Sequence, residues 1–341
     1  MSTAGLNSTP AAAPAPETTG DDGTTYPEWY SRVCVDLSRL PSAAGGNRLD
    51  GMRAVLTRAS WMWDNGQVLT CAFVKPAGSA VQQAKVISVA KEWERYANIK
   101  LDFESAAKKP LDAIIRISFD PRLGSWSTVG KDALHPQDGR ATMNFAFLFS
   151  EPTEAKPGER MTILHEFGHA IGYLHEHQSP RRGDKLKVKE EVAIDFFKRT
   201  QYPPWTEEET RRNFLDLYNR YEISNYSTVD LTSIMMYWMP AQFNEQEIQV
   251  LPNFELSALD KAFAFLNYPF LGGLTSDASQ TLDDALNTIG VTGKFRESIT
   301  AEFNENDWRG VRAEFTRWAL NAKAEASKKE AEAEIGVQND S

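Results

Sequence analysis

Cysteine is rare in this chain of 341 residues, which contains only Cys34 and Cys71. Two cysteines can form one disulfide at most, so the sequence excludes a framework of two or more disulfides. The sequence leaves open whether this single pair forms or whether both residues remain thiols. The low cysteine count agrees with an intracellular location but does not establish it.

Long hydrophobic runs and an excess of basic residues are also absent. No apolar stretch approaches the length of a membrane-spanning helix, and the N-terminus lacks the basic and apolar regions of a signal peptide. We therefore expect no membrane span, and either a cytoplasmic location or non-classical export. The net charge of −10 shows no excess of positive charge that could attract a phosphate backbone, so we expect no nucleic-acid partner. A hydrophobic content of 41% is adequate for a core.

Four of the five histidines lie in one short segment, from His165 to His177. Residues four apart share a face of an α-helix, so His165 and His169 present two imidazoles one turn apart, as two ligands of a tetrahedral zinc ion require. Apolar residues fall on the opposite face, which the helix can bury. Glu166 lies beside the first histidine, where it can take a proton from a water molecule, and is the candidate general base.

A third metal ligand is expected just after this helix, which should run from about Glu159 to Ile171. Gly172 can end a helix with a positive φ and turn the chain back, which would return His175 to the other two histidines. Three protein ligands leave a position for water, as in catalytic zinc sites. Two alternatives stay open at this point: His177 as the third ligand, and a surface helix that carries the pattern by chance.

The histidine segment resembles the long zinc-binding signature of the metzincins, in their astacin-like branch. Downstream, residues 233–237 resemble the methionine turn of astacins, with Met236 where astacins usually have histidine. The resemblance implies that Met235 lies beneath the histidines and that Tyr237 approaches the zinc and stabilises the oxyanion of the transition state. It also implies that His175 is the third ligand.

This resemblance implies a zinc metalloendopeptidase. One catalytic Zn²⁺, held by His165, His169 and His175, would activate a water molecule, with Glu166 as general base and Tyr237 as an oxyanion donor. The partner would be a protein or peptide substrate. Astacin-like proteases are generally exported, so the resemblance favours an extracellular location. Two other functions stay as alternatives: a catalytically silent zinc-binding module that recognises a protein, and a zinc hydrolase acting on a non-peptide bond. The oligomeric state is unknown from the sequence.

The same resemblance implies a metzincin fold of the α+β class, with an α/β upper subdomain built on a mixed sheet and a mostly helical lower subdomain beyond Gly172. Alternating apolar residues predict strands near 68–74, 99–103 and 115–119, and an apolar stripe after Ser79 predicts a helix. In metzincins the strand before the zinc helix edges the cleft and pairs with substrate. The expected match is Ala141 to Ala146, with an interior strand as the alternative.

The sequence divides into four predicted parts. Residues 1–25 read as a disordered tail, 26–55 as an N-terminal extension similar to a pro-segment, 56–270 as the catalytic domain and 271–341 as a C-terminal helical extension. The surroundings of Cys34 loosely resemble the cysteine switch of latent metzincins, although a buried cysteine or half of a disulfide is favoured. Aromatic residues at helical spacing after Trp308 predict a face that packs on the protease or on a neighbouring helix, with a partner-binding face as the alternative.

Overall fold

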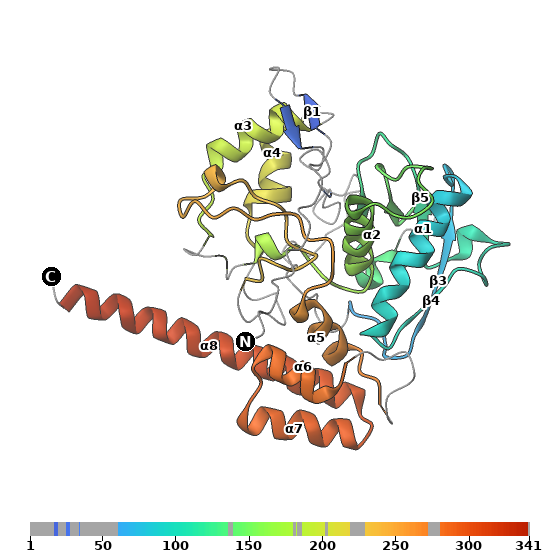
Figure 1. Ribbon diagram of the computed structural model, residues 1–341. Coiled ribbons are helices and arrows are strands. Elements are labelled where there is room, and N and C mark those ends of the chain that lie inside the picture. Colours follow the sequence, from blue (N-terminus) through green and yellow to red (C-terminus); the bar gives the residue numbers. More distant parts are fainter. Residues whose placement is uncertain are drawn as a thin grey trace, which may run out of the picture.

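The computed structural model describes residues 17–19, 25–27, 34, 61–135, 139–179, 182, 186–201, 204–218, 229–271 and 280–339. Figure 1 shows a sheet with helices on one side of the molecule and a largely helical part on the other, with α2 between them. This arrangement confirms the predicted α+β class. Most of the predicted tail and N-terminal extension lies outside the described residues. Within them, β1 (Glu17–Thr19) and β2 (Thr25–Pro27) pair antiparallel.

The upper sheet has five strands in the order β4-β3-β5-β7-β6. Their bounds are β3 (Val68–Phe73), β4 (Lys100–Asp102), β5 (Ile115–Ser118), β6 (Trp126–Ser127) and β7 (Met143–Asn144). All neighbours run parallel except β6 and β7, so the predicted mixed sheet is confirmed. The predicted edge strand is wrong, because β7, which lies within Ala141 to Ala146, is covered by β6 through the pairs Trp126↔Asn144 and Ser127↔Met143. The edge of the sheet on this side is β6.

Helix α1 (Ala80–Ala90) begins where the sequence predicts, at Ser79. The Ser79 side chain accepts from the Gln82 N–H and the Gln82 side chain returns a bond to the Ser79 N–H, which forms a capping box. The α-helix ends earlier than the apolar stripe, and a 3₁₀ segment, η3 (Lys91–Arg95), continues it. Trp93 in this segment is fully buried, and its Nε1 donates to Leu164 O at 3.0 Å. The apolar face that begins in α1 therefore continues through Trp93 and packs on α2, although the backbone changes from an α-helix to a 3₁₀ helix at Lys91.

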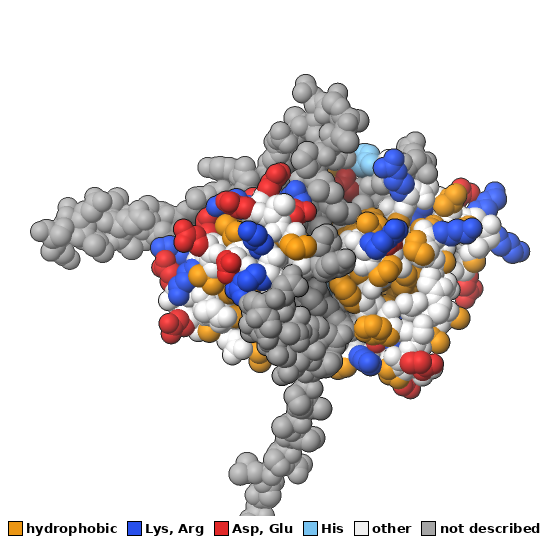
Figure 2. Space-filling model, turned by 90° about the horizontal axis from the view of Figure 1, so that it is seen from above, with side chains coloured by type: hydrophobic (Ala, Val, Ile, Leu, Met, Phe, Trp, Pro, Cys, Tyr) orange, Lys and Arg blue, Asp and Glu red, His pale blue; other side chains and the backbone are white. Residues whose placement is uncertain are grey.

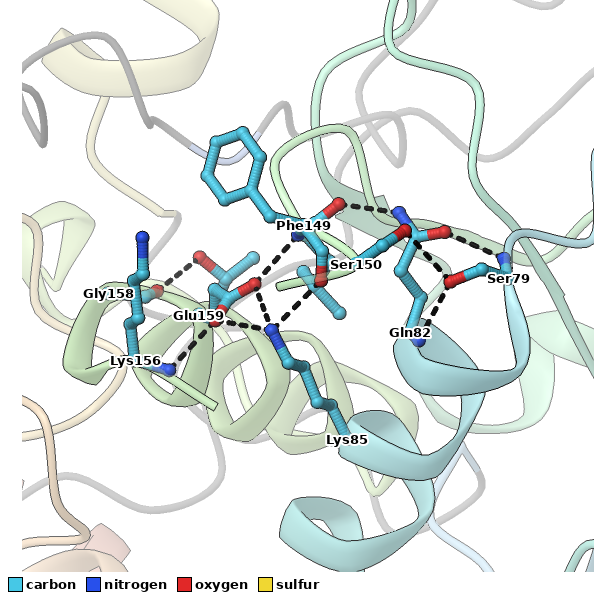
Figure 3. Close-up of polar contacts among 10 residues, drawn as sticks. Ser79, Gln82, Lys85, Phe149, Ser150, Lys156, Gly158 and Glu159 are labelled. Carbon is cyan, nitrogen blue, oxygen red and sulfur yellow. Dashed lines mark hydrogen bonds and ion pairs between the residues drawn. The ribbon is translucent and has the colours of Figure 1, made fainter. Parts of the chain in front are cut away.

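Helix α2 (Pro157–Ala170) carries two of the three predicted zinc ligands, His165 and His169, and a buried ion pair fixes its first turn. Lys85 Nζ of α1 lies 2.9 Å from both carboxylate oxygens of Glu159, and both side chains are inaccessible to solvent. Glu159 also accepts from the N–H groups of Phe149 and Lys156, as Figure 3 shows. Because a buried charge is tolerated only when paired and hydrogen-bonded, this cluster joins α1, α2 and the segment that precedes α2.

The lower part of the chain is mostly helical, as predicted. Its helical segments are η6 (Glu176–Gln178), α3 (Glu190–Thr200), α4 (Glu207–Thr210), η8 (Arg211–Leu215), η9 (Ala241–Phe243) and α5 (Ala258–Asn267). Short 3₁₀ turns also occur in the upper part, at η4 (Pro110–Asp112) and η5 (Gly130–Leu134). A second core of aromatic residues, including Phe197, Phe214 and Phe243, supports this part.

Three helices follow the lower part: α6 (Leu282–Ile289), α7 (Gly293–Asn304) and α8 (Trp308–Asn339). Leu286 of α6 and Phe315 of α8 are fully buried and belong to the same core as Phe167 of α2. The Phe315 ring lies 5.3 Å from that of Phe263 in α5. The prediction that the aromatic face of the last helix packs on the protease is therefore confirmed. Gly272 and Gly273, which would make a plausible linker before these helices, lie outside the described residues.

The face seen in Figure 2 carries acidic and basic side chains interspersed on its left-hand part, and hydrophobic side chains among basic ones on its right-hand part. Among the described helices, none is both long enough and apolar enough to cross a membrane.

Candidate metal centre

The three predicted histidine ligands converge on one point. His165 and His169 lie one turn apart on α2, and the chain turns back at Gly172, whose φ is 110°. This turn brings His175 Nε2 to 3.1 Å from His169 Nε2. One ligand atom from each of the three histidines and the sulfur of Cys34 lie within 4.8 Å of one another. Ligand atoms of a tetrahedral zinc ion are roughly 3.3–3.8 Å apart, so the group is of the right size for one ion.

The hydrogen bonds of these histidines indicate which ring nitrogen faces the metal. His165 Nδ1 lies 2.8 Å from Ile234 O, and His169 Nδ1 lies 2.8 Å from Tyr173 O. His175 Nδ1 lies 3.2 Å from Gln178 Oε1. Because an oxygen acceptor holds the proton on Nδ1, the Nε2 atoms are left as lone-pair donors.

Two further observations show that the site fits a cation. His165 Nε2 is buried and has no hydrogen-bond partner among the described residues. His169 and His175 direct two lone pairs at each other across 3.1 Å, an arrangement that a shared cation makes favourable. Burial, and the nearby His169, lower the pKa of His165 to about 3 and that of His175 well below its ordinary value. Neutral imidazole is the form that binds a metal.

Glu166 brings a buried carboxylate to the edge of the histidine cluster. Its Oε1 has no hydrogen-bond partner in the described part of the chain, and its Oε2 accepts from Cys34 Sγ at 3.5 Å. Burial raises the pKa of this carboxyl to about 8, and the bond from Cys34 opposes the rise. A carboxyl with a raised pKa beside a metal site is poised to exchange protons near neutral pH.

The predicted methionine turn lies against α2. A Cβ built on Gly168 would come within 2.5 Å of Met235 Sδ, so glycine at this position leaves room for the Met235 side chain against α2. Asp260 of α5 holds the turn by accepting from Ser233 Oγ at 2.7 Å and from Ile234 N at 2.8 Å. The Ile234 carbonyl, in turn, is the acceptor for His165.

Tyr237, the last residue of this turn, faces the site. Its ring lies 4.6 Å from that of His175 and 4.0 Å from that of His177. Its hydroxyl donates to the backbone oxygen of Cys34. Tyr237 is therefore placed to donate a hydrogen bond to a carbonyl group beside the histidines.

Cys34 is the residue whose position the sequence did not predict. It does not pair with Cys71, which donates to Leu69 O inside the sheet. Instead Cys34 Sγ lies 3.7 Å from His169 Nε2 and its backbone bridges to Ser125, the residue just before β6. The loose similarity to a cysteine switch was the available signal. Of the two favoured alternatives, half of a disulfide is wrong, whereas a buried cysteine agrees with the structure, in which Cys34 is buried.

His177, the alternative third ligand, is buried but directed away from the cluster. Its Nε2 lies 3.1 Å from Asn213 O, and its ring stacks on Tyr237. The neighbouring Glu176 makes a local hydrogen bond, accepting from Asp230 N at 2.9 Å. Both residues thus support the turn that carries His175.

A small pocket opens beside Glu166 and His165. Apolar side chains dominate its lining, with Phe147, Met161, Met236 and Trp238 among them. Cys34 also lines it. The pocket therefore adjoins both the candidate general base and Tyr237.

Comparisons with known proteins agree with this geometry. The family model described as Astacin (Peptidase family M12A) matches residues 56–255. A solved structure of myroilysin is 30% identical with a TM-score of 0.56, over 63% of this chain and 98% of that one. A crystal structure of myroilysin is 27% identical with a TM-score of 0.46, over 65% and 100%. High choriolytic enzyme 1, a hatching enzyme zinc-protease from the medaka fish Oryzias latipes, is 14% identical with a TM-score of 0.40, over 64% and 98%. No curated protein sequence matches.

Proposed function

The chain belongs to the astacin family of metalloendopeptidases, peptidase family M12A, and we propose that it cleaves peptide bonds with one zinc ion held by His165, His169 and His175. The observation that carries the proposal is the convergence of three buried Nε2 atoms whose Nδ1 partners are all oxygens. The methionine turn and Gln178 fix two of these rings from outside. A preorganised set of this kind is what a catalytic metal requires.

The zinc ion would supply Lewis acidity, which polarises the scissile carbonyl and lowers the pKa of a water molecule. Glu166 would take the proton of the attacking water and later deliver it to the leaving amine. Its buried, partnerless Oε1 supports this role. Tyr237 would donate to the developing oxyanion, as its bond to the Cys34 carbonyl suggests.

The proposed substrate is an extended stretch of protein or peptide. The bridge between Cys34 and Ser125 supports backbone pairing along the β6 side of the site, because an extended chain can add to an open sheet edge. The described residues that line the pocket beside Glu166 include no lysine, arginine or aspartate. We therefore propose that it receives an apolar side chain next to the scissile bond.

We further propose that the full chain is latent, because Cys34 takes the position that water needs. Its sulfur lies beside both Glu166 Oε2 and His169 Nε2, and a thiolate is a strong zinc ligand. Its backbone carbonyl also takes the hydrogen bond of Tyr237. In this proposal the sulfur of Cys34 occupies the place of water, and its backbone carbonyl occupies the place of the substrate carbonyl. Activation would require its displacement.

Metal content and cleavage measured on the same samples test this proposal. Full-length protein, a Cys34→Ala variant and a Cys71→Ala variant would be assayed for bound zinc and for cleavage of unfolded casein, with and without 1,10-phenanthroline. We expect one zinc per chain in all three. Chelator-sensitive cleavage should rise at least tenfold in Cys34→Ala and stay at the parent level in the cysteine control.

Each other outcome has a definite meaning. A Cys34→Ala protein that holds zinc but cuts neither casein nor a set of denatured proteins would favour the catalytically silent binding module. Full activity in the unmodified chain would contradict latency but support the peptidase. Absence of zinc from all three proteins would contradict the metal centre itself.

A further inference from the structure

The end of the zinc helix leaves carbonyl groups that the helix cannot satisfy. The last residues of an α-helix have no N–H donor one turn ahead. In α2 the affected groups include Ala170 O and Ile171 O, which lie directly before the turn at Gly172. That turn carries Tyr173, the acceptor for His169 Nδ1, and then His175. The geometry of two metal ligands therefore depends on how these carbonyls are held.

Two buried aromatic side chains hold them. Trp63 Nε1 donates to Ala170 O at 2.7 Å, and the Tyr268 hydroxyl donates to Ile171 O at 2.7 Å. Both side chains are fully buried. They are also joined to each other, because the backbone N–H of Trp63 donates to the Tyr268 hydroxyl at 3.3 Å. One comes from before the sheet and the other from the end of α5, so the cap is assembled from distant parts of the chain.

Arg312 of α8 joins these two capping residues from behind. It is only 5% exposed, and its guanidinium donates to Trp63 O at 3.0 Å and to Asn267 O through Nε at 3.0 Å. The guanidinium also lies 5.0 Å from the centre of the Tyr268 ring. A buried guanidinium is costly unless its donors are used. Here its planar fork spans the backbones of both capping segments, which a single ammonium cannot do.

The helix that carries Arg312 lies outside the matched family region, which ends at residue 255. In Figure 1, α6, α7 and α8 gather around α5, at the end of the molecule away from β1. Val311 and Phe315 flank Arg312 and are fully buried. The C-terminal extension is thus fixed to the catalytic part at the point where it reaches the cap of α2.

We propose that Arg312 is a positioning residue for the metal centre, and that the C-terminal extension sets metal affinity by holding Trp63 and Tyr268 against the end of α2. The inference rests on the proposed zinc site. It assigns the extension a part in that site that does not require contact with the histidines, because it is reached through Ala170, Ile171 and the turn at Gly172.

Titration with Co²⁺ tests this role without any assay of activity. Metal-free full-length protein would be titrated while the visible absorption of bound Co²⁺ is recorded, for the wild type, Arg312→Gln, Arg312→Lys and Tyr268→Phe. We expect Arg312→Gln to weaken Co²⁺ binding about 10- to 100-fold, the usual loss for partners that orient metal ligands. The Co²⁺ affinity of Arg312→Lys should lie between those of Arg312→Gln and the wild type. Tyr268→Phe, which removes one hydroxyl, should weaken Co²⁺ binding several-fold.

Arg317→Gln is the matched control, since Arg317 lies on the same helix with its side chain 68% exposed; it should bind Co²⁺ as the wild type does. Circular dichroism and the unfolding midpoint of the metal-free proteins separate folding from positioning. A folded Arg312→Gln protein with a lowered midpoint but unchanged Co²⁺ affinity and spectrum would overturn the proposal. If that variant does not fold, unchanged affinity in Tyr268→Phe overturns it instead. A wild type that binds no Co²⁺ would contradict the zinc site and not the role of Arg312 alone.

Discussion

At the scale of single residues, Glu166 is the group on which the proposed chemistry depends most directly. In a Cys34→Ala background, Glu166→Ala should keep one zinc per chain but lower the rate of casein cleavage about 10²- to 10⁴-fold, the usual contribution of a positioned general base. Metal analysis and a fluorescent casein assay measure the two effects. Glu154→Ala, an exposed position before α2, is the control. Cleavage by Glu166→Ala at the parent rate would remove this carboxylate from the mechanism.

Glu176 offers a test of stability against pH. Burial raises the pKa of its carboxyl from 4.5 to about 8, and the charges of Asp230 and Asp260 add to the rise. Between these two pH values the folded protein binds more protons at this site than the unfolded chain does, so its stability falls as the pH rises. Glu176→Gln removes this loss. Relative to wild type, the variant should therefore gain free energy of unfolding between pH 5 and pH 8, by at most about 1.4 kcal/mol per pH unit.

Urea unfolding of the metal-free proteins at both pH values measures this gain, because a zinc ion at the neighbouring His175 would itself lower the pKa of Glu176. The exposed Glu208 provides the matched control, because Glu208→Gln should differ from wild type by the same amount at pH 5 and at pH 8. If Glu176→Gln differs from the wild type by the same free energy of unfolding at pH 5 and at pH 8, the carboxyl is ionised in the folded protein and the argument from burial fails.

At the scale of elements, the pair Lys85–Glu159 determines how α1 and the zinc helix are joined. Lys85→Met would leave the Glu159 carboxylate buried without its cation, which typically costs about 3–5 kcal/mol. The two N–H donors that remain, from Phe149 and Lys156, would offset only part of this. Denaturant unfolding should show a loss of this size. Adding Glu159→Gln to Lys85→Met should restore part of the stability, and the exposed Lys91→Met is the control. A loss below about 1 kcal/mol in Lys85→Met would show that the carboxylate becomes protonated or solvated.

The sequence predicted elements whose determinants are local. The zinc helix, the turn at Gly172 and the cap at Ser79 each depend on residues within one or two turns, and each forms where it was expected. The predicted edge strand was wrong, because the pairs Trp126↔Asn144 and Ser127↔Met143 join residues 18 and 16 positions apart, and no periodicity in the sequence indicates them. Strand order is a property of the assembled sheet.

The same distinction separates the parts of the candidate site. The spacing of His165, His169 and His175 carries its own geometric reason, so the cluster could be predicted from the sequence. Cys34 approaches Glu166 across 132 positions, and only packing of the whole chain determines that contact. Trp63 and Tyr268 were missed for the same reason, since nothing in the sequence marks a tryptophan or a tyrosine as the cap of a distant helix.

At the scale of the whole molecule, the metal centre and its cap join parts of the chain that are far apart in sequence. The histidines join α2 to the segment beyond Gly172, the methionine turn adds the lower part, and Cys34 adds the N-terminal segment. On the other side, Arg312 of α8 reaches Trp63 and Tyr268, whose side chains donate to the carbonyls at the end of α2. An N-terminal residue, Cys34, therefore contacts the histidines, while a C-terminal residue, Arg312, supports the cap of the helix that carries two of them.

This organisation predicts that removing the metal destabilises the whole fold. A ligand that binds only the folded state stabilises it by about 4 kcal/mol when its free concentration is 1,000 times its dissociation constant. Because the entropy of unfolding grows with chain length, each kcal/mol shifts the thermal midpoint of a protein of this size by about 1.4 °C, so chelation should lower the midpoint by about 6 °C. Calorimetry with and without chelator measures the shift. His175→Ala should abolish most of it, whereas His135→Ala, whose side chain is 72% exposed, should retain it. An unchanged midpoint after complete removal of zinc from the wild type would mean that the three histidines are held together by packing alone.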